Sequence, residues 1–171
     1  MMVKFSRVWA MPSRHTFTIK PIAELLGREV NGTGVWVDPF AGYHSPAHIT
    51  NDINPETPAS CHMDALSFLR NFDDNSVYGV LFDPPYSPRQ LSECYKSVGV
   101  SVNNETTQSK FWGDLKKEIS RVIQQGGKCI TFGWNSGGIG VNLGFSISEI
   151  LLVPHGGWHN DTIVTVEVKA E

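Results

Sequence analysis

The sequence has 171 residues and a mass of 18.9 kDa, the length of one domain that buries about two-thirds of its unfolded surface. Hydrophobic residues make up 40% of the chain and charged residues 18%, which excludes a disordered chain. The net charge of −3 excludes a protein held to nucleic acid by bulk charge alone. We therefore expect residues 1–171 to form a single globular domain.

The cysteines and the apolar runs bear on the compartment. Cys61, Cys94 and Cys129 are odd in number and widely spaced, so they favour neither a disulfide framework nor a thiolate zinc site. The first residues contain no long apolar run, and no later run approaches the length of a membrane span. We expect a cytoplasmic protein without a membrane partner.

Expected strands and helices alternate along the chain. In chain order, we expect a short helix over 21–26 ended by Gly27, a strand over 34–38, a helix over 64–72, a strand over 77–83, a helix over 109–125 stopped by Gly126 and Gly127, and strands over 128–132, 147–153 and 162–168. This alternation predicts an α/β domain with a largely parallel sheet. The last strand alternates apolar and polar residues, which predicts a half-exposed or edge strand.

The strongest chemical motif is Asp83-Pro84-Pro85-Tyr86, directly after the expected strand over 77–83. Ligands of open α/β sheets bind outside the carboxyl ends of the strands. Two successive prolines restrict the backbone, so that a carboxylate, a carbonyl and an aromatic ring are held in one arrangement. The alternative is a proline-rich surface turn or a polyproline ligand.

This motif resembles that of the DNA amino-methyltransferases, which modify the exocyclic nitrogen of adenine or cytosine, and among them the small phage-type adenine-specific enzymes. The family's second motif is matched by Asp38-Pro39-Phe40-Ala41-Gly42, after the earlier expected strand. The resemblance implies a Rossmann-like class I methyltransferase fold, in which a seven-stranded, mostly parallel sheet ends in an antiparallel strand. It also places a cofactor-side segment at Phe17–Leu26 and the end of a third strand at Met63.

The resemblance assigns roles to individual residues. The Asp83 carboxylate and the Pro84 carbonyl would accept the two N–H bonds of the target amine, Pro85 would hold the turn, and Tyr86 would stack on the flipped base. The implied cofactor is S-adenosylmethionine. Its binding residues would be Asp38, Pro39, Phe40 and Gly42 near the methionine half, Asp52 at the ribose, and Asp64 and Ala65 at the adenine. Two alternatives stay open: Asp52 as an Asx-turn residue and Asp64 as a plain helix N-cap.

The chain departs from the family pattern after its first motif. Relatives run a full helix before the second strand, whereas here Tyr43 is followed almost at once by His48-Ile49-Thr50. Because a parallel crossover ordinarily needs ten or more residues, we expect this helix to be deleted. A noncatalytic subunit that binds S-adenosylmethionine or nucleic acid is therefore an alternative to an enzyme.

No segment corresponds to a separate target-recognition domain, so contacts with DNA are expected from loops. The long polar loop over 87–107 contains Arg89, Tyr95 and Lys96, and the turn over 154–161 contains His155 and His159. The alternatives are an inconsequential surface loop and a hairpin with incidental polar residues.

We expect the protein to transfer a methyl group to N6 of adenine in DNA, in a duplex from which the target base is flipped out. A homodimer is one way in which two such loops could contact the same DNA. Cytosine N4 in DNA and adenine N6 in RNA remain alternatives. Two histidine pairs at a spacing of four, His44 with His48 and His155 with His159, lie outside the expected helices, so we expect no metal.

Overall fold

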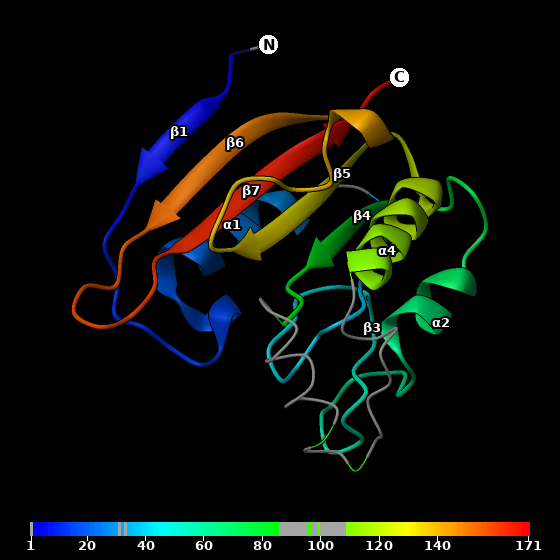
Figure 1. The fold of residues 1–171 in the computed structure, drawn as a ribbon, viewed down its shortest axis with the longest axis horizontal. Coiled ribbons are helices and arrows are strands. Elements are labelled where there is room, and N and C mark those ends of the chain that lie inside the picture. The colour runs from blue at the N-terminus through cyan, green and yellow to red at the C-terminus, as the bar shows by residue number, and fades with distance from the viewer. Residues whose placement is uncertain (1, 31, 33, 86–95, 97–98, 100–108) are drawn as a thin grey trace.

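The computed structural model describes all residues except 1, 31, 33, 86–95, 97–98 and 100–108 (Figure 1). The described elements are β1 (Lys4–Arg7), η1 (Thr16–Thr18), α1 (Lys20–Val30), β2 (Trp36–Asp38), β3 (Ile49–Thr50), α2 (Ala65–Arg70), β4 (Val77–Phe82), α4 (Ser109–Val122), β5 (Ile123–Gly133), η2 (Val141–Leu143), β6 (Phe145–Val153) and β7 (Thr162–Lys169). Across the described ranges, every helix is too short or too polar to cross a membrane.

The strands form a seven-stranded sheet in the order β1-β6-β7-β5-β4-β2-β3. The last strand, β7, runs antiparallel to both of its neighbours, β5 and β6, whereas the other pairs are parallel. The expected α/β class and the mostly parallel sheet with an antiparallel last strand are confirmed. The parallel strands β2, β4 and β5 therefore present their carboxyl ends at one edge of the sheet.

The membership of the sheet differs from the expectation at two strands. The segment before Met63 was expected to be a strand, but only Cys61 pairs there, in an isolated bridge to Asn51. The strand β1 was not expected, because it lacks an apolar run; it forms by parallel pairing with β6 at the outer edge. Long-range pairing decided both differences.

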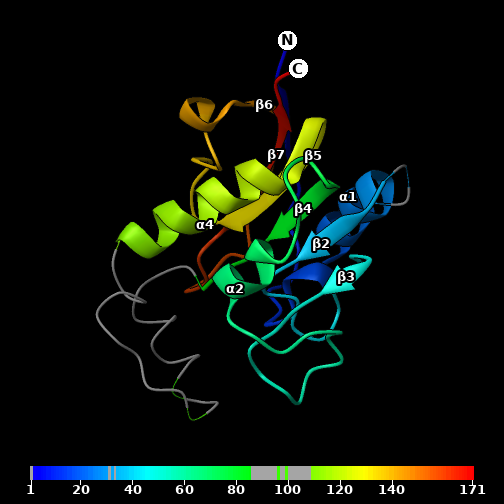
Figure 2. The same ribbon diagram turned by 90° about the vertical axis from the view of Figure 1, so that its right-hand side faces the viewer.

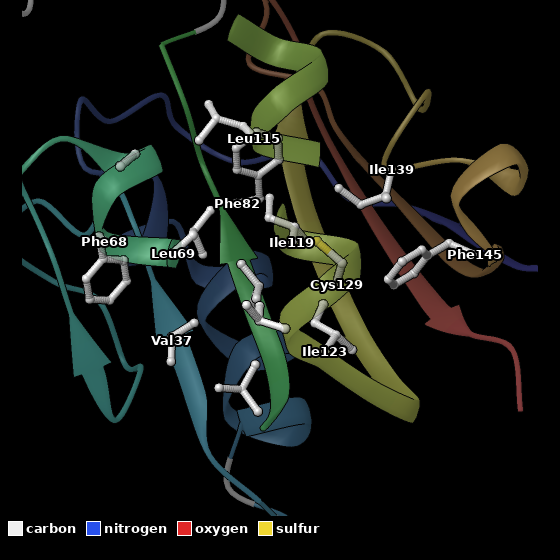
Figure 3. Close-up of a cluster of buried hydrophobic side chains, with 14 of the residues drawn as sticks. Val37, Phe68, Leu69, Phe82, Leu115, Ile119, Ile123, Cys129, Ile139 and Phe145 are labelled. Carbon is white, nitrogen blue, oxygen red and sulfur yellow. The ribbon is translucent and has the colours of Figure 1, made fainter. Parts of the chain in front are cut away.

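Helices cover both faces of the sheet (Figure 2). The helices α2 and α4 pack on one face, where Phe68, Leu115 and Ile119 belong to one buried cluster (Figure 3). The helix α1 packs on the other face, where Ile22 and Leu26 join a second cluster. The sheet thus separates two hydrophobic cores and holds the strand ends rigidly between them.

The central pairing of β2 with β4 depends on a glycine. Trp36 lies opposite Gly79 in the parallel register, and its ring is fully buried. A Cβ atom added at Gly79 would lie 2.4 Å from the ring, so the ring can cover β4 only because this residue has no side chain. This contact anchors the two strands that carry the sequence motifs.

The ends predicted for α1 and α4 were wrong, and α2 spans Ala65–Arg70 instead of residues 64–72. The helix α1 continues through Gly27 to Val30, because burial of Val30 in the core outweighs the cost of about 1 kcal/mol for glycine in a helix. The helix α4 ends at Val122 instead of residue 125, because Ile123 already pairs with Val77 of β4. The positive φ of 72° at Gly126 belongs to the irregular start of β5.

The expectation that the last strand is a half-exposed or edge strand was also wrong. The strand β7 lies between β5 and β6, and its polar residues Thr165 and Glu167 are 0% and 1% exposed. The Glu167 carboxylate accepts hydrogen bonds from the amides of Ile139 (2.6 Å) and Gly140 (2.9 Å). The connection between β5 and β6 therefore covers a face that the alternating pattern assigns to solvent.

Candidate active site

A cavity of about 460 Å³ lies at the carboxyl ends of β2, β4 and β5. Its walls bring together segments far apart in the sequence: Pro12, Ser13, Arg14, Thr16, Pro39, Phe40, Asp52, Ile53, Met63, Ala65, Asp83, Pro84, Pro85, Trp134, His155, His159, Asn160 and Thr162. This volume falls within the range of about 300–1,000 Å³ for small-molecule sites. The cavity is the candidate active site.

The residues Asp83-Pro84-Pro85 enter the cavity wall directly after β4. Four consecutive residues of the strand, from Gly79 to Phe82, pair with β5, so the position of Asp83 follows from a rigid element. The predicted position at a strand end is confirmed for these three residues. Tyr86 lies outside the described residues.

Asp38, at the end of β2, is fully buried and does not line the cavity. Its carboxylate accepts hydrogen bonds from the Phe40 amide (2.9 Å) and the Ser45 hydroxyl (2.6 Å). Burial raises the pKa of Asp38 to about 7, and the charges of Asp83 and Asp52 add to that rise. The carboxylates of Asp52 and Asp83 therefore lie near enough to Asp38 to act on its charge, in a site whose wall also contains Arg14.

Asp52 braces the first motif loop. Its Oδ2 accepts a hydrogen bond from the Gly42 amide (2.8 Å), where φ is 57°, and its Oδ1 accepts one from the Asn54 amide (2.9 Å). The second bond is the Asx turn that the sequence left open as an alternative. Asp52 also lines the cavity, so the carboxylate faces both the loop and the space for a ligand.

The helix expected to be missing after the first motif is missing. Residues 39–48 connect β2 to β3 by turns alone. The buried Asn51 takes over the task of organising this loop: its Nδ2 donates to the carbonyls of Pro39 (3.2 Å) and Met63 (2.8 Å), and its Oδ1 accepts from the Met63 amide (3.0 Å). Sequence reasoning missed Asn51, since an asparagine after a strand more often marks a surface turn.

Asp64 and Ala65 occupy different positions. Asp64 is the N-cap of α2, where its side chain accepts a hydrogen bond from the Ser67 amide (2.9 Å), so the capping alternative is confirmed. Ala65 lines the main cavity, whereas Gly42 lines an adjoining hollow of about 80 Å³. Pro39, Phe40 and Ala65 thus all line the main cavity, whereas Gly42 does not line it.

The turn over 154–161 lies on the cavity side, as expected, and both His155 and His159 line the cavity. His155 is 7% exposed, with Nδ1 bonded to the Ala10 carbonyl (2.9 Å) and Nε2 to the Thr162 hydroxyl (2.8 Å). Because the carbonyl only accepts, Nδ1 carries a proton, and both ring nitrogens are already engaged. Of the pair, His159 is the exposed side chain.

Of the three residues in the long loop that were predicted to contact nucleic acid, the structure describes one. Lys96 is exposed, whereas Arg89 and Tyr95 lie outside the described residues. In the ranges that the structure describes, no group of three or more histidine, cysteine or acidic side chains could hold a metal ion.

Sequence reasoning missed the N-terminal wall of the cavity. The segment over 12–16 supplies Arg14, and Phe17 is instead buried against Phe132 with ring centroids 5.0 Å apart. The cofactor-side segment expected at Phe17–Leu26 begins directly after residues 12–16, and Phe17 lines the adjoining hollow of about 80 Å³. No local pattern marks residues 12–16, because pairing of β1 with β6 brings them to the cavity.

No protein-family model matches the chain, and a search of the curated proteins finds no match either. Among solved structures, the 1,6-didemethyltoxoflavin-N1-methyltransferase of Burkholderia thailandensis, solved with S-adenosylhomocysteine, is similar with a TM-score of 0.61 and 11% identity over 89% of this chain and 78% of that one.

Two further structures are similar. TrmN from Thermus thermophilus has a TM-score of 0.53 and 16% identity over 88% of this chain, which spans about half (49%) of TrmN. The PH0226 protein from Pyrococcus horikoshii has a TM-score of 0.55 and 13% identity over 88% of each chain. Together with the strand order, these similarities show that the chain has the class I methyltransferase fold.

Proposed function

We propose that this protein is a methyltransferase that uses S-adenosylmethionine to methylate the exocyclic N6 nitrogen of adenine in DNA. One observation carries the proposal: Asp83-Pro84-Pro85 stands in the wall of the same cavity as Pro39 and Phe40 of the first motif. The two motifs are separated along the sequence, and the pairing of β2 with β4 brings them together.

The residues around the cavity fit this cofactor. S-adenosylmethionine carries a sulfonium and an ammonium group against one carboxylate, so it is a cation overall. Asp52 and Asp83 line the cavity, and their carboxylates can face the cationic groups of the cofactor. Burial is the main cause of the raised pKa of Asp38, and the charges of Asp83 and Asp52 add to it. When bound, the cofactor would supply an activated methyl group. Pro39, Phe40, Asp52 and Ala65 are the residues that would hold it.

The chemistry of an aromatic amine explains the second motif. The lone pair of such a nitrogen is delocalised into the ring, which makes the amine a poor nucleophile. The Asp83 carboxylate and the Pro84 carbonyl would each accept one N–H bond and draw the nitrogen towards tetrahedral geometry. The lone pair then points out of the ring plane. After transfer, the extra proton on the nitrogen can pass to the Asp83 carboxylate or to water.

The experiment that tests this proposal combines cofactor binding with methyl transfer. We expect calorimetry to detect binding of S-adenosylmethionine, and labelled cofactor to transfer its methyl group to adenine-containing DNA. Asp83→Ala should reduce the transfer rate by about 10²–10³ while most cofactor binding remains, because it removes one acceptor for the developing charge. Nucleoside analysis of the digested product then separates N6-methyladenine from N4-methylcytosine.

The matched control is Asp73→Ala, which removes an exposed carboxylate on the turn before β4. This variant should methylate DNA like the parent. If Asp83→Ala incorporated the methyl label almost as fast as the parent, Asp83 would have no role in the reaction. Transfer to RNA and not to DNA would mean that the protein is a methyltransferase with RNA as its substrate.

A second candidate function is a noncatalytic subunit that binds the cofactor or nucleic acid. The observation that favours it is the helix-free connection over 39–48, since a helix N-terminus normally contributes amide donors beside a bound ligand. Cofactor binding without transfer to any DNA, RNA or free base would decide for this candidate.

A further inference from the structure

A second cavity, of about 260 Å³, lies next to the candidate active site. Its lining includes Pro84, Pro85, Trp112, Lys116 and Trp134. Three of these residues, Pro84, Pro85 and Trp134, also line the main cavity. The catalytic turn and one indole therefore form the wall between two adjoining binding spaces.

The lining of the second cavity combines a stacking surface with a cation. Trp112 and Lys116 are four residues apart on α4, so they share one face of the helix. Trp112 packs edge-on against Phe111, with ring centroids 6.0 Å apart, which holds its indole in place. Trp134 is 45% exposed and stands after the end of β5. Aromatic planes and a nearby ammonium are the groups that bind a base and its phosphate.

The charge of Lys116 is available to a ligand. The side chain is half-buried and forms no ion pair with any described residue. The buried acid Glu167 is engaged by the amides of Ile139 and Gly140. Burial raises the pKa of Glu167, and the positive charge of Lys116 opposes that rise without forming an ion pair with it.

The main cavity is the larger of the two and holds the motif residues, so the second is a subsite beside it. We propose that the second cavity binds the nucleotide next to the target base in an unpaired strand of DNA, with its base against Trp112 and its phosphate near Lys116. A nucleotide bound in the second cavity would be unstacked from the double helix, as the target base is. Because two neighbouring nucleotides would then be unpaired, we expect the substrate to be a single strand rather than a duplex with one flipped base. This inference rests on the proposed function.

The test compares ligands that do and do not reach the second cavity. Binding of a single-stranded DNA hexanucleotide, of its duplex and of deoxyadenosine monophosphate is measured without cofactor, by fluorescence anisotropy and competition. The parent should bind the single strand more tightly than either of the other ligands. Trp112→Leu should weaken binding of the hexanucleotide between about fivefold and a hundredfold and leave the mononucleotide unchanged, because one stacked base is lost.

Lys116→Gln gives a second, independent measurement. It should lower the slope of log K against log salt by about 0.7 for the single strand, since one phosphate contact is lost. Lys117→Gln, the exposed neighbour on α4, and Trp9→Leu, an exposed indole after β1, are the matched controls and should behave like the parent. Circular dichroism and melting curves verify that each variant is folded.

The inference would be overturned by tighter binding of the duplex than of the single strand, by equal losses for the mononucleotide and the hexanucleotide in Trp112→Leu, or by no loss in either variant. Binding of S-adenosylmethionine without any binding of DNA would overturn it and leave a methyltransferase of another substrate. The expected DNA binding without any binding of the cofactor would instead overturn the proposed function and leave the subsite in place.

Discussion

At the scale of single residues, the candidate site is organised by carboxylates with different tasks. Asp83 stands in the cavity wall after β4, Asp52 holds the Gly42 amide, and Asp38 is buried under the first motif loop. The charges of Asp83 and Asp52 both act on Asp38. Asp38 therefore lies in the field of two other carboxylates, and a cation bound beside them would oppose that effect.

The buried Asp38 makes the stability of the free protein depend on pH. Its pKa rises from 3.8 in the unfolded chain to about 7 in the fold, so between these values the folded state keeps a proton that the unfolded state releases. The free energy of unfolding therefore falls as pH rises through this window, by an amount on the order of 4 kcal/mol. Asp38→Asn should remove this contribution.

Urea unfolding at several pH values from 4 to 8 checks this prediction. The difference in unfolding free energy between Asp38→Asn and the parent should change across the window, whereas Asp73→Asn, an exposed control, should follow the parent throughout. Parallel curves for Asp38→Asn and the parent would mean that Asp38 is ionised at low pH in the fold.

Asp52 is expected to support cofactor binding through the loop as well as by direct contact. Asp52→Ala removes the acceptor of the Gly42 amide and should weaken binding of S-adenosylmethionine by about 1.5–3 kcal/mol. Asp52→Asn retains one acceptor oxygen for that amide and should lose less. Calorimetry measures both variants, and parental affinity in Asp52→Ala would leave Asp52 as a turn residue only.

At the scale of elements, the connection over 39–48 does without a helix because side chains replace it. Asn51 ties the first motif to the segment before α2, and Ser45 donates to Asp38. Each of these contacts depends on β2 being in place, and β2 depends on its close packing against β4. The geometry of the site therefore depends on the pairing of β2 with β4.

Gly79→Ala tests that dependence. The added Cβ would lie 2.4 Å from the ring of Trp36, so the strands must shift, and the free energy of unfolding should fall by about 1–3 kcal/mol. The matched control is Gly27→Ala within α1, where a Cβ would meet nothing within 4 Å. It should stabilise the protein by about 0.5–1 kcal/mol. Denaturant unfolding measures both, and equal effects would refute the contact.

At the scale of the whole molecule, the sheet separates two hydrophobic cores. Ile119 of α4 belongs to the core on one face, and Ile22 of α1 belongs to the core on the other. Both side chains are 0% exposed. The carboxyl ends of the strands, where the candidate site lies, are consequently supported from both sides.

Because the two cores are separated by the sheet, their contributions to stability should add. Ile119→Val and Ile22→Val should each lower the free energy of unfolding by about 0.5–1.5 kcal/mol. The double variant should lose the sum within about 0.5 kcal/mol. Thermal and denaturant unfolding of the three variants checks this. A coupling larger than that would mean that the strands transmit strain between the faces.

Local sequence patterns were enough to predict the parts of this protein that depend on neighbouring residues. Apolar runs followed by Asp-Pro predicted β2 and β4 and the position of Asp83 at a strand end, because burial and proline restrict the backbone locally. The small number of residues between Gly42 and Ile49 was enough to predict the missing helix, since a helix and its turns do not fit there.

Other features depend on which distant segments of the chain pack together, and these could not be predicted from local patterns. The insertion of β7 between β5 and β6 buried Glu167, which a strand pattern assigns to solvent. Pairing of β1 with β6 carried Arg14 to the cavity, and the Asp52 carboxylate met the Gly42 amide across two loops. Contacts of this kind are set by long-range packing, for which a single sequence offers no local signal.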